Sequence, residues 1–215
     1  MVEQNLFSNP KRLIGIKPLI KLPKLSIFKK IVNKIFGFED EDANLITMSD
    51  ELDQCDLDVK FARLFNNSGG VFNYCASEKE ALGILKKIAA DEHFNHFFCA
   101  DDILQKYLEL IKKNYTNQLT SQTQVAFITC EQLIAHDAKI MLSFDNIRHY
   151  TPAQLPTNIV FMATVSQIVA NLSEAMMKVK RRPGIKNLCS ISGKNFSLGN
   201  ENDQQKRIFL LLLED

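Results

Sequence analysis

The chain has 215 residues, of which 46% are hydrophobic and 24% charged, and this composition is ordinary for a globular protein with one sizeable core. Its formal net charge of +1 at pH 7 excludes a strong overall attraction to nucleic acid. No apolar run approaches the ~20 residues that span a bilayer, so we expect no integral membrane segment.

The cysteines are odd in number, widely spaced and without a C-x-x-C pair: Cys55, Cys75, Cys99, Cys130 and Cys189. Such spacing fits neither a disulfide framework nor an iron–sulfur or zinc cage. Lysines and prolines between Lys17 and Pro23 interrupt what would have to be the apolar core of a secretory signal. We therefore expect a cytoplasmic protein without a metal or cofactor of its own.

Charge is distributed in two opposed blocks near the N-terminus. Eight basic residues and one acid lie between Met1 and Phe36, and nine acids without Lys or Arg lie between Glu39 and Asp58. The favoured interpretation is two solvated faces, because exposed ion pairs are weak. Alternatively the blocks would pair with each other, or the basic one would meet an anionic partner, a dinucleotide cofactor or a membrane surface. Helical spacing over Ser26 to Phe36 fits either a membrane-surface helix or a helix docked on protein. We divide the chain into a basic arm, helix and acidic linker (1–48) and an α/β domain (49–215).

From residue 57 onward the pattern alternates between helix and strand. A helical stripe ends at Gly69-Gly70, a strand follows over 71–76, and Ser77 with Glu80 caps a second helix over 81–90. Another strand over 94–100 precedes a helix over 103–111 capped by Asp101. The polar segment 114–124 is predicted to be a loop.

The second half of the chain continues the alternation. We predict strands over 125–130, 138–144, 158–163, 188–192 and 207–214. Thr164 and Gln167 predict the start of a helix that runs to Val179 and ends at Pro183-Gly184. Strands this apolar are expected where both faces of a sheet are covered. The fold class is therefore α/β, with a mainly parallel sheet flanked by helices and an N-terminal basic extension.

One candidate anion site follows the predicted strand 188–192. Ser192 is the last residue of this strand, and the backbone amide of Gly193, Lys194 and Asn195 follow it, at the kind of strand end where open α/β sheets collect their ligands. Hydroxyls, a close backbone amide and one ammonium suit a carboxylate or phosphate. A plain solvated turn explains the same residues.

Three other groups of residues are less specific. His136 and Asp137 would be a base and its orienter, but neighbours on a strand point to opposite faces. A buried structural thiol is the favoured interpretation of Cys130 over a nucleophile. His93, His96 and Cys99 combine helical spacing with a strand-like aromatic run, so a metal site there is disfavoured.

The order of these elements resembles the LUD domain of the lactate-utilisation protein C (LutC) family. The resemblance covers about 57–214 and rests on the helix ending in Gly-Gly, VAFITCEQLIAHDAKIML, NIVFMA followed by SQIV, and the late SISG. It implies a fold similar to the sugar-phosphate isomerase and CoA-transferase group (NagB/RpiA/CoA-transferase-like). It also implies work beside two iron–sulfur partner proteins that oxidise L-lactate to pyruvate, and it assigns this subunit type no direct catalytic role.

The chain departs from the family at the ligand motif. Where members read I-T-G-A-D-x-x-I-A-E-T-G-T, Ile134 and Ala135 match, while the next four positions, Glu-Thr-Gly-Thr in the family, are occupied here by 136–139 (HDAK). In the late motif Lys194 and Asn195 replace Pro-Ser. The site is therefore expected to be altered or silent, and its candidate ligand-binding residues are Glu131, His136, Asp137, Ser192, Gly193, Lys194 and Asn195.

Three functions remain open from the sequence. The first is an accessory protein of L-lactate or organic-acid oxidation that binds a small anionic ligand or an electron-transfer partner. The second is a structural or interaction protein with a silent pocket, whose basic arm binds the partner. The third is an acyl- or CoA-transferring enzyme that uses Glu131 as its carboxylate nucleophile.

Overall fold

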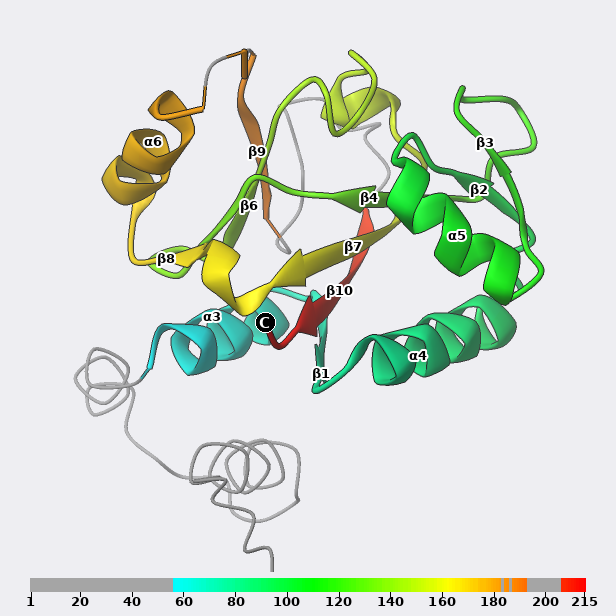
Figure 1. Ribbon diagram of the computed structural model, residues 1–215, viewed down its shortest axis with the longest axis horizontal. Coiled ribbons are helices and arrows are strands. Elements are labelled where there is room, and N and C mark those ends of the chain that lie inside the picture. Colours follow the sequence, from blue (N-terminus) through cyan, green and yellow to red (C-terminus); the bar gives the residue numbers. More distant parts are fainter. Residues whose placement is uncertain (1–55, 183, 186, 193–205) are drawn as a thin grey trace, which may run out of the picture. The chain divides into compact units, whose positions relative to one another are not determined.

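The computed structural model describes residues 56–182, 184–185, 187–192 and 206–215, which Figure 1 shows in colour. The basic arm, most of the acidic block and the predicted boundary after residue 48 lie outside the described residues, as do Gly193, Lys194 and Asn195. Among the helices that are described, none is long and apolar enough to cross a membrane.

The first described elements agree with the sequence pattern. Helix α3 (Leu57–Asn67) buries Phe61 and Phe65 completely, one turn apart on one face. The chain then turns at Gly69, whose φ of 87° suits glycine, and enters strand β1 (Val71–Cys75).

The next two helices begin at the predicted caps. Ser77 Oγ accepts a hydrogen bond from the backbone N–H of Glu80 at the start of α4 (Glu78–Asp91). Asp101 caps α5 (Asp102–Leu110) by accepting from two backbone N–H groups. Strand β2 (His96–Phe98) precedes α5 and strand β3 (Asn114–Thr116) follows it, within the segment predicted to be a loop.

The main sheet has six strands in the order β1-β10-β7-β4-β2-β3, and every neighbouring pair is parallel. Its central strands are β4 (Val125–Thr129), β7 (Asn158–Thr164) and β10 (Arg207–Leu213). Helices α4 and α5 cover one face, where Leu85 and Leu108 join a core with Phe127 and Val160. The mainly parallel α/β sheet is thereby confirmed.

A second sheet of four strands was not predicted. Its order is β8-β5-β6-β9, built from β5 (Gln132–Ile134), β6 (Lys139–Leu142), β8 (Ile168–Val169) and β9 (Cys189–Ser192). Strand β6 runs antiparallel to both β5 and β9. Helix α6 (Leu172–Lys180) covers one face by packing Ala175 and Val179 against Ile134, Met141 and Val169. Leu133, Ile140 and Leu142, which alternate onto the other face, are fully buried inside the molecule.

The predicted helix from Thr164 to Val179 is wrong in its first half. Gln167 does accept a hydrogen bond from the backbone N–H of Thr164, at 2.8 Å, but the turn that it closes is a short 3₁₀ helix, η2 (Val165–Gln167). Ile168 and Val169 then pair with β5, because β-branched side chains suit a strand and tertiary pairing overrides helical spacing. Helix α6 begins later, after the cap Asn171.

His136 and Asp137 do not lie on a strand. They occupy the turn between β5 and β6, where both are exposed. The next residue, Ala138, has a left-handed φ of 51° that completes the turn.

Candidate functional site

The candidate site lies beyond the carboxyl ends of two central parallel strands. Strands β4 and β7 pair directly, with Thr129 opposite Met162. Cys130 and Glu131 follow β4, and η2 follows β7. Ligands of open α/β sheets collect at such an edge, because the chain leaves each strand there and side chains of different loops converge.

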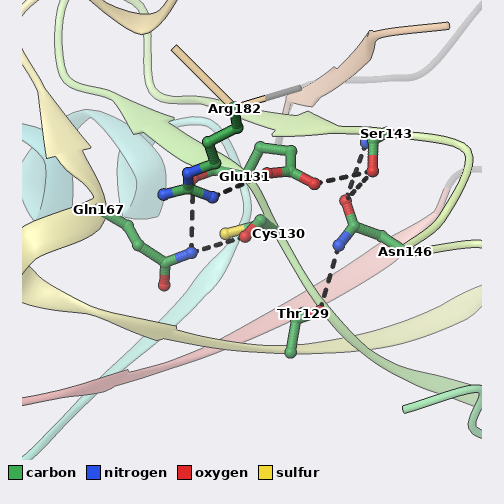
Figure 2. Close-up of polar contacts among 7 residues, drawn as sticks. All are labelled: Thr129, Cys130, Glu131, Ser143, Asn146, Gln167 and Arg182. Atoms are coloured by element: carbon green, nitrogen blue, oxygen red, sulfur yellow. Dashed lines mark hydrogen bonds and ion pairs between the residues drawn. The ribbon is translucent and has the colours of Figure 1, made fainter. Parts of the chain in front are cut away.

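Glu131 is the centre of the polar contacts at this edge (Figure 2). Its Oε1 accepts the hydroxyl hydrogen of Ser143 at 2.7 Å, and its Oε2 accepts a hydrogen bond from Arg182 Nη1 at 3.2 Å. The Glu131 side chain is only 10% exposed, whereas that of Arg182 is 56% exposed. A carboxylate removed from water needs such partners, and the structure supplies both a hydroxyl and a cation.

Ser143 extends the network away from Glu131. It is fully buried, and Asn146 Oδ1 accepts its backbone N–H at 2.8 Å and lies 3.0 Å from its hydroxyl oxygen. Asn146 Nδ2 in turn donates to Thr129 Oγ1 at 3.2 Å. A hydroxyl carries one hydrogen, so we assign it to the shorter contact with Glu131. Side-chain contacts therefore run without interruption from Arg182 to the end of β4.

Gln167 joins the ends of the two strands. Its Oε1 accepts the backbone N–H of Thr164 at the end of β7, and its Nε2 donates to the carbonyl oxygen of Cys130 at 2.6 Å. One amide side chain thus bonds to both strand ends and holds the backbone of Glu131 in place. We call the seven residues of Figure 2 the Glu131 cluster: Thr129, Cys130, Glu131, Ser143, Asn146, Gln167 and Arg182.

Cys130 contributes its backbone and not a reactive thiol. Burial raises the pKa of its thiol well above the ordinary value, and the neighbouring Glu131 carboxylate raises it further. The thiol therefore stays protonated at neutral pH and is a poor nucleophile. The favoured interpretation of Cys130 as a buried structural thiol agrees with this position.

Arg182 is the group of the cluster best suited to a ligand. Glu131 takes Nη1, while the edge formed by Nε and Nη2 has no partner among the residues that the structure describes. A guanidinium edge of this kind binds a carboxylate or phosphate through two parallel hydrogen bonds. The arrangement can therefore bind an anion at the rim of the sheet.

The structure separates the residues that the sequence grouped. Glu131 belongs to the cluster, but His136 and Asp137 lie at the opposite end of the β5–β6 hairpin. Ser192 is opposite Lys139 in β6, near that turn, and Gly193 to Asn195 are outside the described residues.

Near the same turn, Asp137 pairs with Lys139 at 2.7 Å. Both side chains are more than a third exposed, so the pair contributes little stability. Of the predicted ligand residues, Glu131 alone lies beside Arg182 among the described positions.

His96 and Cys99, which were considered as metal ligands, differ in their exposure to solvent. His96 is exposed at the start of β2, whereas Cys99 is buried just beyond its end. Burial raises the pKa of the Cys99 thiol to about 12. In the described part of the chain, no three His, Cys, Asp or Glu side chains gather as a metal site would require.

Five residues of the cluster were missed by the sequence reasoning: Thr129, Ser143, Asn146, Gln167 and Arg182. Ser143, Asn146 and Arg182 carry no motif, and Arg182 is 51 residues from its partner Glu131. Gln167 was noted only as part of a helix start. The position of Gln167 just after an apolar strand could have placed it near Glu131, because the carboxyl ends of parallel strands meet at one edge of the sheet.

Comparison with known proteins supports the fold. No family model matches the chain, and no curated protein matches it either. Among solved structures, a DUF162 family protein from Deinococcus radiodurans is similar, with a TM-score of 0.58 and 15% sequence identity. The match covers 74% of this chain and 96% of that protein. The DUF162 family corresponds to LUD-domain proteins, so the two chains share a fold of the kind that the sequence order resembled.

Proposed function

We propose that this protein binds a small carboxylate at Arg182 and serves as an accessory component of organic-acid oxidation. The observation that carries the proposal is the half-exposed guanidinium of Arg182, anchored by the buried carboxylate of Glu131 at the carboxyl edge of β4 and β7. The resemblance to the lactate-utilisation protein C family and the fold shared with a DUF162 protein support L-lactate or pyruvate as the first ligands to try.

The anchor explains why an arginine is suited to this task. Glu131 fixes one amino group of the guanidinium, which lowers the side-chain entropy that a ligand would otherwise have to remove. The Nε and Nη2 edge, which has no partner among the described residues, matches the two oxygens of a carboxylate. A lysine in the same place would be a point charge without this geometry, so it would bind the same anion less selectively.

Ligand-induced thermal stabilisation tests the proposal. We expect L-lactate or pyruvate at about a hundred times its dissociation constant to raise the unfolding midpoint by several degrees, because bound ligand then adds roughly 2.7 kcal/mol. Arg182→Ala should abolish the increase. Arg181→Ala is a matched control, since Arg181 is the adjacent exposed arginine at the end of α6.

Two outcomes would contradict the proposal in different ways. A ligand response that survives Arg182→Ala would remove Arg182 from the site. A wild-type protein that responds to none of the organic acids, CoA esters, sugar phosphates or nucleotides would remove the ligand-binding function itself. Each variant is compared with and without ligand, so its own stability does not enter the result.

The proposed partners are iron–sulfur subunits of lactate oxidation in the cytoplasm. This part of the proposal is supported by the family resemblance and concerns the whole assembly. The test is to purify the tagged full chain from its natural host grown on L-lactate and to measure iron and acid-labile sulfide in the co-purified proteins. Co-purification without either element would contradict these partners.

Two alternatives have their own tests. Acyl transfer through Glu131 is less well supported, because both carboxylate oxygens already accept hydrogen bonds. We expect no glutamyl adduct after incubation with a labelled CoA ester. Partner binding through the basic arm remains a prediction, and deletion of residues 1–36 tests it by the loss of association with an intact fold.

A further inference from the structure

Asn146 is separated from Arg182 by two residues, Ser143 and Glu131, along the side-chain contacts of the Glu131 cluster. It lies in the loop of residues 143–150, which joins β6 to the segment before β7. Its amide side chain holds Ser143 through Oδ1 and Thr129 through Nδ2. No hydrogen bond joins Asn146 directly to Arg182 in the described structure, and the side-chain hydrogen bonds between them pass through Ser143 and Glu131.

Ser143 transmits that influence because its hydroxyl is fully buried. The hydroxyl oxygen lies 2.7 Å from Glu131 Oε1 and 3.0 Å from Asn146 Oδ1. The hydroxyl hydrogen is donated to Glu131, while Asn146 Oδ1 holds the backbone N–H of Ser143 at 2.8 Å. Removal of Asn146 therefore releases the Ser143 backbone, and the Glu131 carboxylate is less firmly oriented. The other oxygen of that carboxylate holds Arg182.

We propose that Asn146 is a positioning residue for Arg182, acting through Ser143 and Glu131, so that the 143–150 loop and the anion site are coupled. The inference deepens the proposed function, because it concerns the same guanidinium. Coupling of this kind is reciprocal: whatever loosens the loop frees Arg182, and whatever removes Arg182 loosens the loop.

The 143–150 loop is suited to such coupling. Arg148 and His149 are consecutive non-glycine residues with left-handed φ values of 49° and 64°, which carry a conformational cost. The backbone N–H of His149 donates to the carbonyl of Phe144, and the two rings meet edge to face. A loop held in a costly conformation relaxes when one of its anchors is lost, and the Asn146 side chain is one of these anchors.

The first experiment measures how available Arg182 is to phenylglyoxal, which modifies arginine. In the full chain, Asn146→Ala should raise the modification rate of Arg182 by roughly threefold or more relative to Arg181, as expected for coupled neighbours. Asp145→Ala is the matched control, because Asp145 is an exposed residue of the same loop. It should leave the ratio of the two rates unchanged.

The second experiment measures the reverse direction by amide hydrogen exchange. Arg182→Ala should accelerate exchange at Ile147, His149 and Tyr150, whose N–H groups donate within the loop. Arg181→Ala should not, and the amides of α4 should exchange at the wild-type rate in both variants.

The outcomes separate this inference from the proposed function, since neither measurement contains a ligand. An unchanged Arg182 to Arg181 ratio in Asn146→Ala overturns it, and so does an equal increase at every arginine, which would report general loosening. If Asn146→Ala fails to fold, Thr129→Val removes only the hydroxyl that Asn146 Nδ2 reaches. It should produce a smaller increase at Arg182, and no increase overturns the coupling.

Discussion

At the scale of single residues, the pair of Glu131 and Arg182 joins a buried anion to a half-exposed cation. Removing the cation leaves the buried Glu131 carboxylate with the Ser143 hydroxyl as its remaining side-chain partner among the described residues. Removing the charge of Glu131 leaves Arg182, which water can solvate. The two substitutions should therefore have unequal costs.

We expect Arg182→Ala to lower the free energy of unfolding by roughly 1–3 kcal/mol, and Glu131→Gln to lower it by less. The double variant should cost less than the sum, because the buried charge that lacks a partner is then gone. Urea denaturation of the four proteins measures this cycle. A larger cost for Glu131→Gln would contradict this expectation. It would mean that loss of the carboxylate destabilises the protein more than leaving that carboxylate without its cation.

Another ion pair gives a pH dependence at the residue scale. Arg207 donates two hydrogen bonds to the Glu92 carboxylate, at 2.6 and 2.7 Å, and these hold the pKa of Glu92 below its ordinary value of 4.5. Burial opposes this effect and raises the pKa of Glu92, and the nearby positive charges of Arg207 and His93 lower it further.

A lowered pKa in the folded state adds stability that is present above the unfolded pKa and is lost as the pH falls through the folded value. The difference in unfolding free energy between the wild type and Glu92→Gln should therefore be constant near neutral pH. It should shrink on acidification below about pH 4.5. A difference that stays constant through the acid range would contradict the linkage.

At the scale of elements, Gly70 and Gly83 differ in the space that a side chain would find. A Cβ on Gly70 would lie 2.4 Å from the buried ring of Phe65, at the junction of α3 and β1. A Cβ on Gly83, in the middle of α4, meets nothing within 4 Å.

Gly70→Ala should therefore destabilise the protein, by roughly 1–3 kcal/mol for the overpacking. Gly83→Ala should stabilise it by about 0.5–1 kcal/mol, because alanine is the better helix former. Thermal unfolding of both variants measures the pair. If Gly70→Ala stabilised the protein as much as Gly83→Ala, the Phe65 ring would have moved away from the new methyl group at no cost in free energy.

The caps and the turn after β7 show how far local patterns predict elements. Ser77 and Asp101 cap their helices as predicted, because a cap depends on residues within a few positions of each other. The Thr164 and Gln167 pattern was correct as a contact but wrong as a helix start. Pairing of Ile168 and Val169 with β5, more than 30 residues away, decided that segment.

At the scale of the whole described molecule, the two sheets are joined closely. Only Cys130 and Glu131 separate β4 of the main sheet from β5 of the second, and Gln167 bonds across the junction. Fully buried side chains such as Ile140 show that the face of the second sheet away from α6 is covered as well.

We therefore expect one cooperative unfolding transition for the described domain. Because the chain has no tryptophan, tyrosine fluorescence reports tertiary packing and far-ultraviolet circular dichroism reports secondary structure. The two denaturation curves should coincide. A separate early transition in either signal would mean that the second sheet and α6 unfold on their own.

The comparison with the DUF162 protein from Deinococcus radiodurans also concerns the whole fold. At 15% identity it shows a common fold and leaves the chemistry to the residues at the sheet edge. Glu131 was named from the sequence, because it lies within the stretch that resembles the family's ligand motif. Its neighbours Ser143, Asn146 and Arg182 came only with the structure.

What the sequence by itself determined is the alternation of helices and strands, several of their caps and the parallel character of the main sheet. These follow from periodicity and from contacts between near neighbours, which every segment carries in its own residues. Tertiary structure alone decided that a second sheet forms, that His136 and Asp137 lie in a turn, and that Arg182 meets Glu131 from 51 residues away. Such contacts depend on how the whole core packs, so no local pattern encodes them.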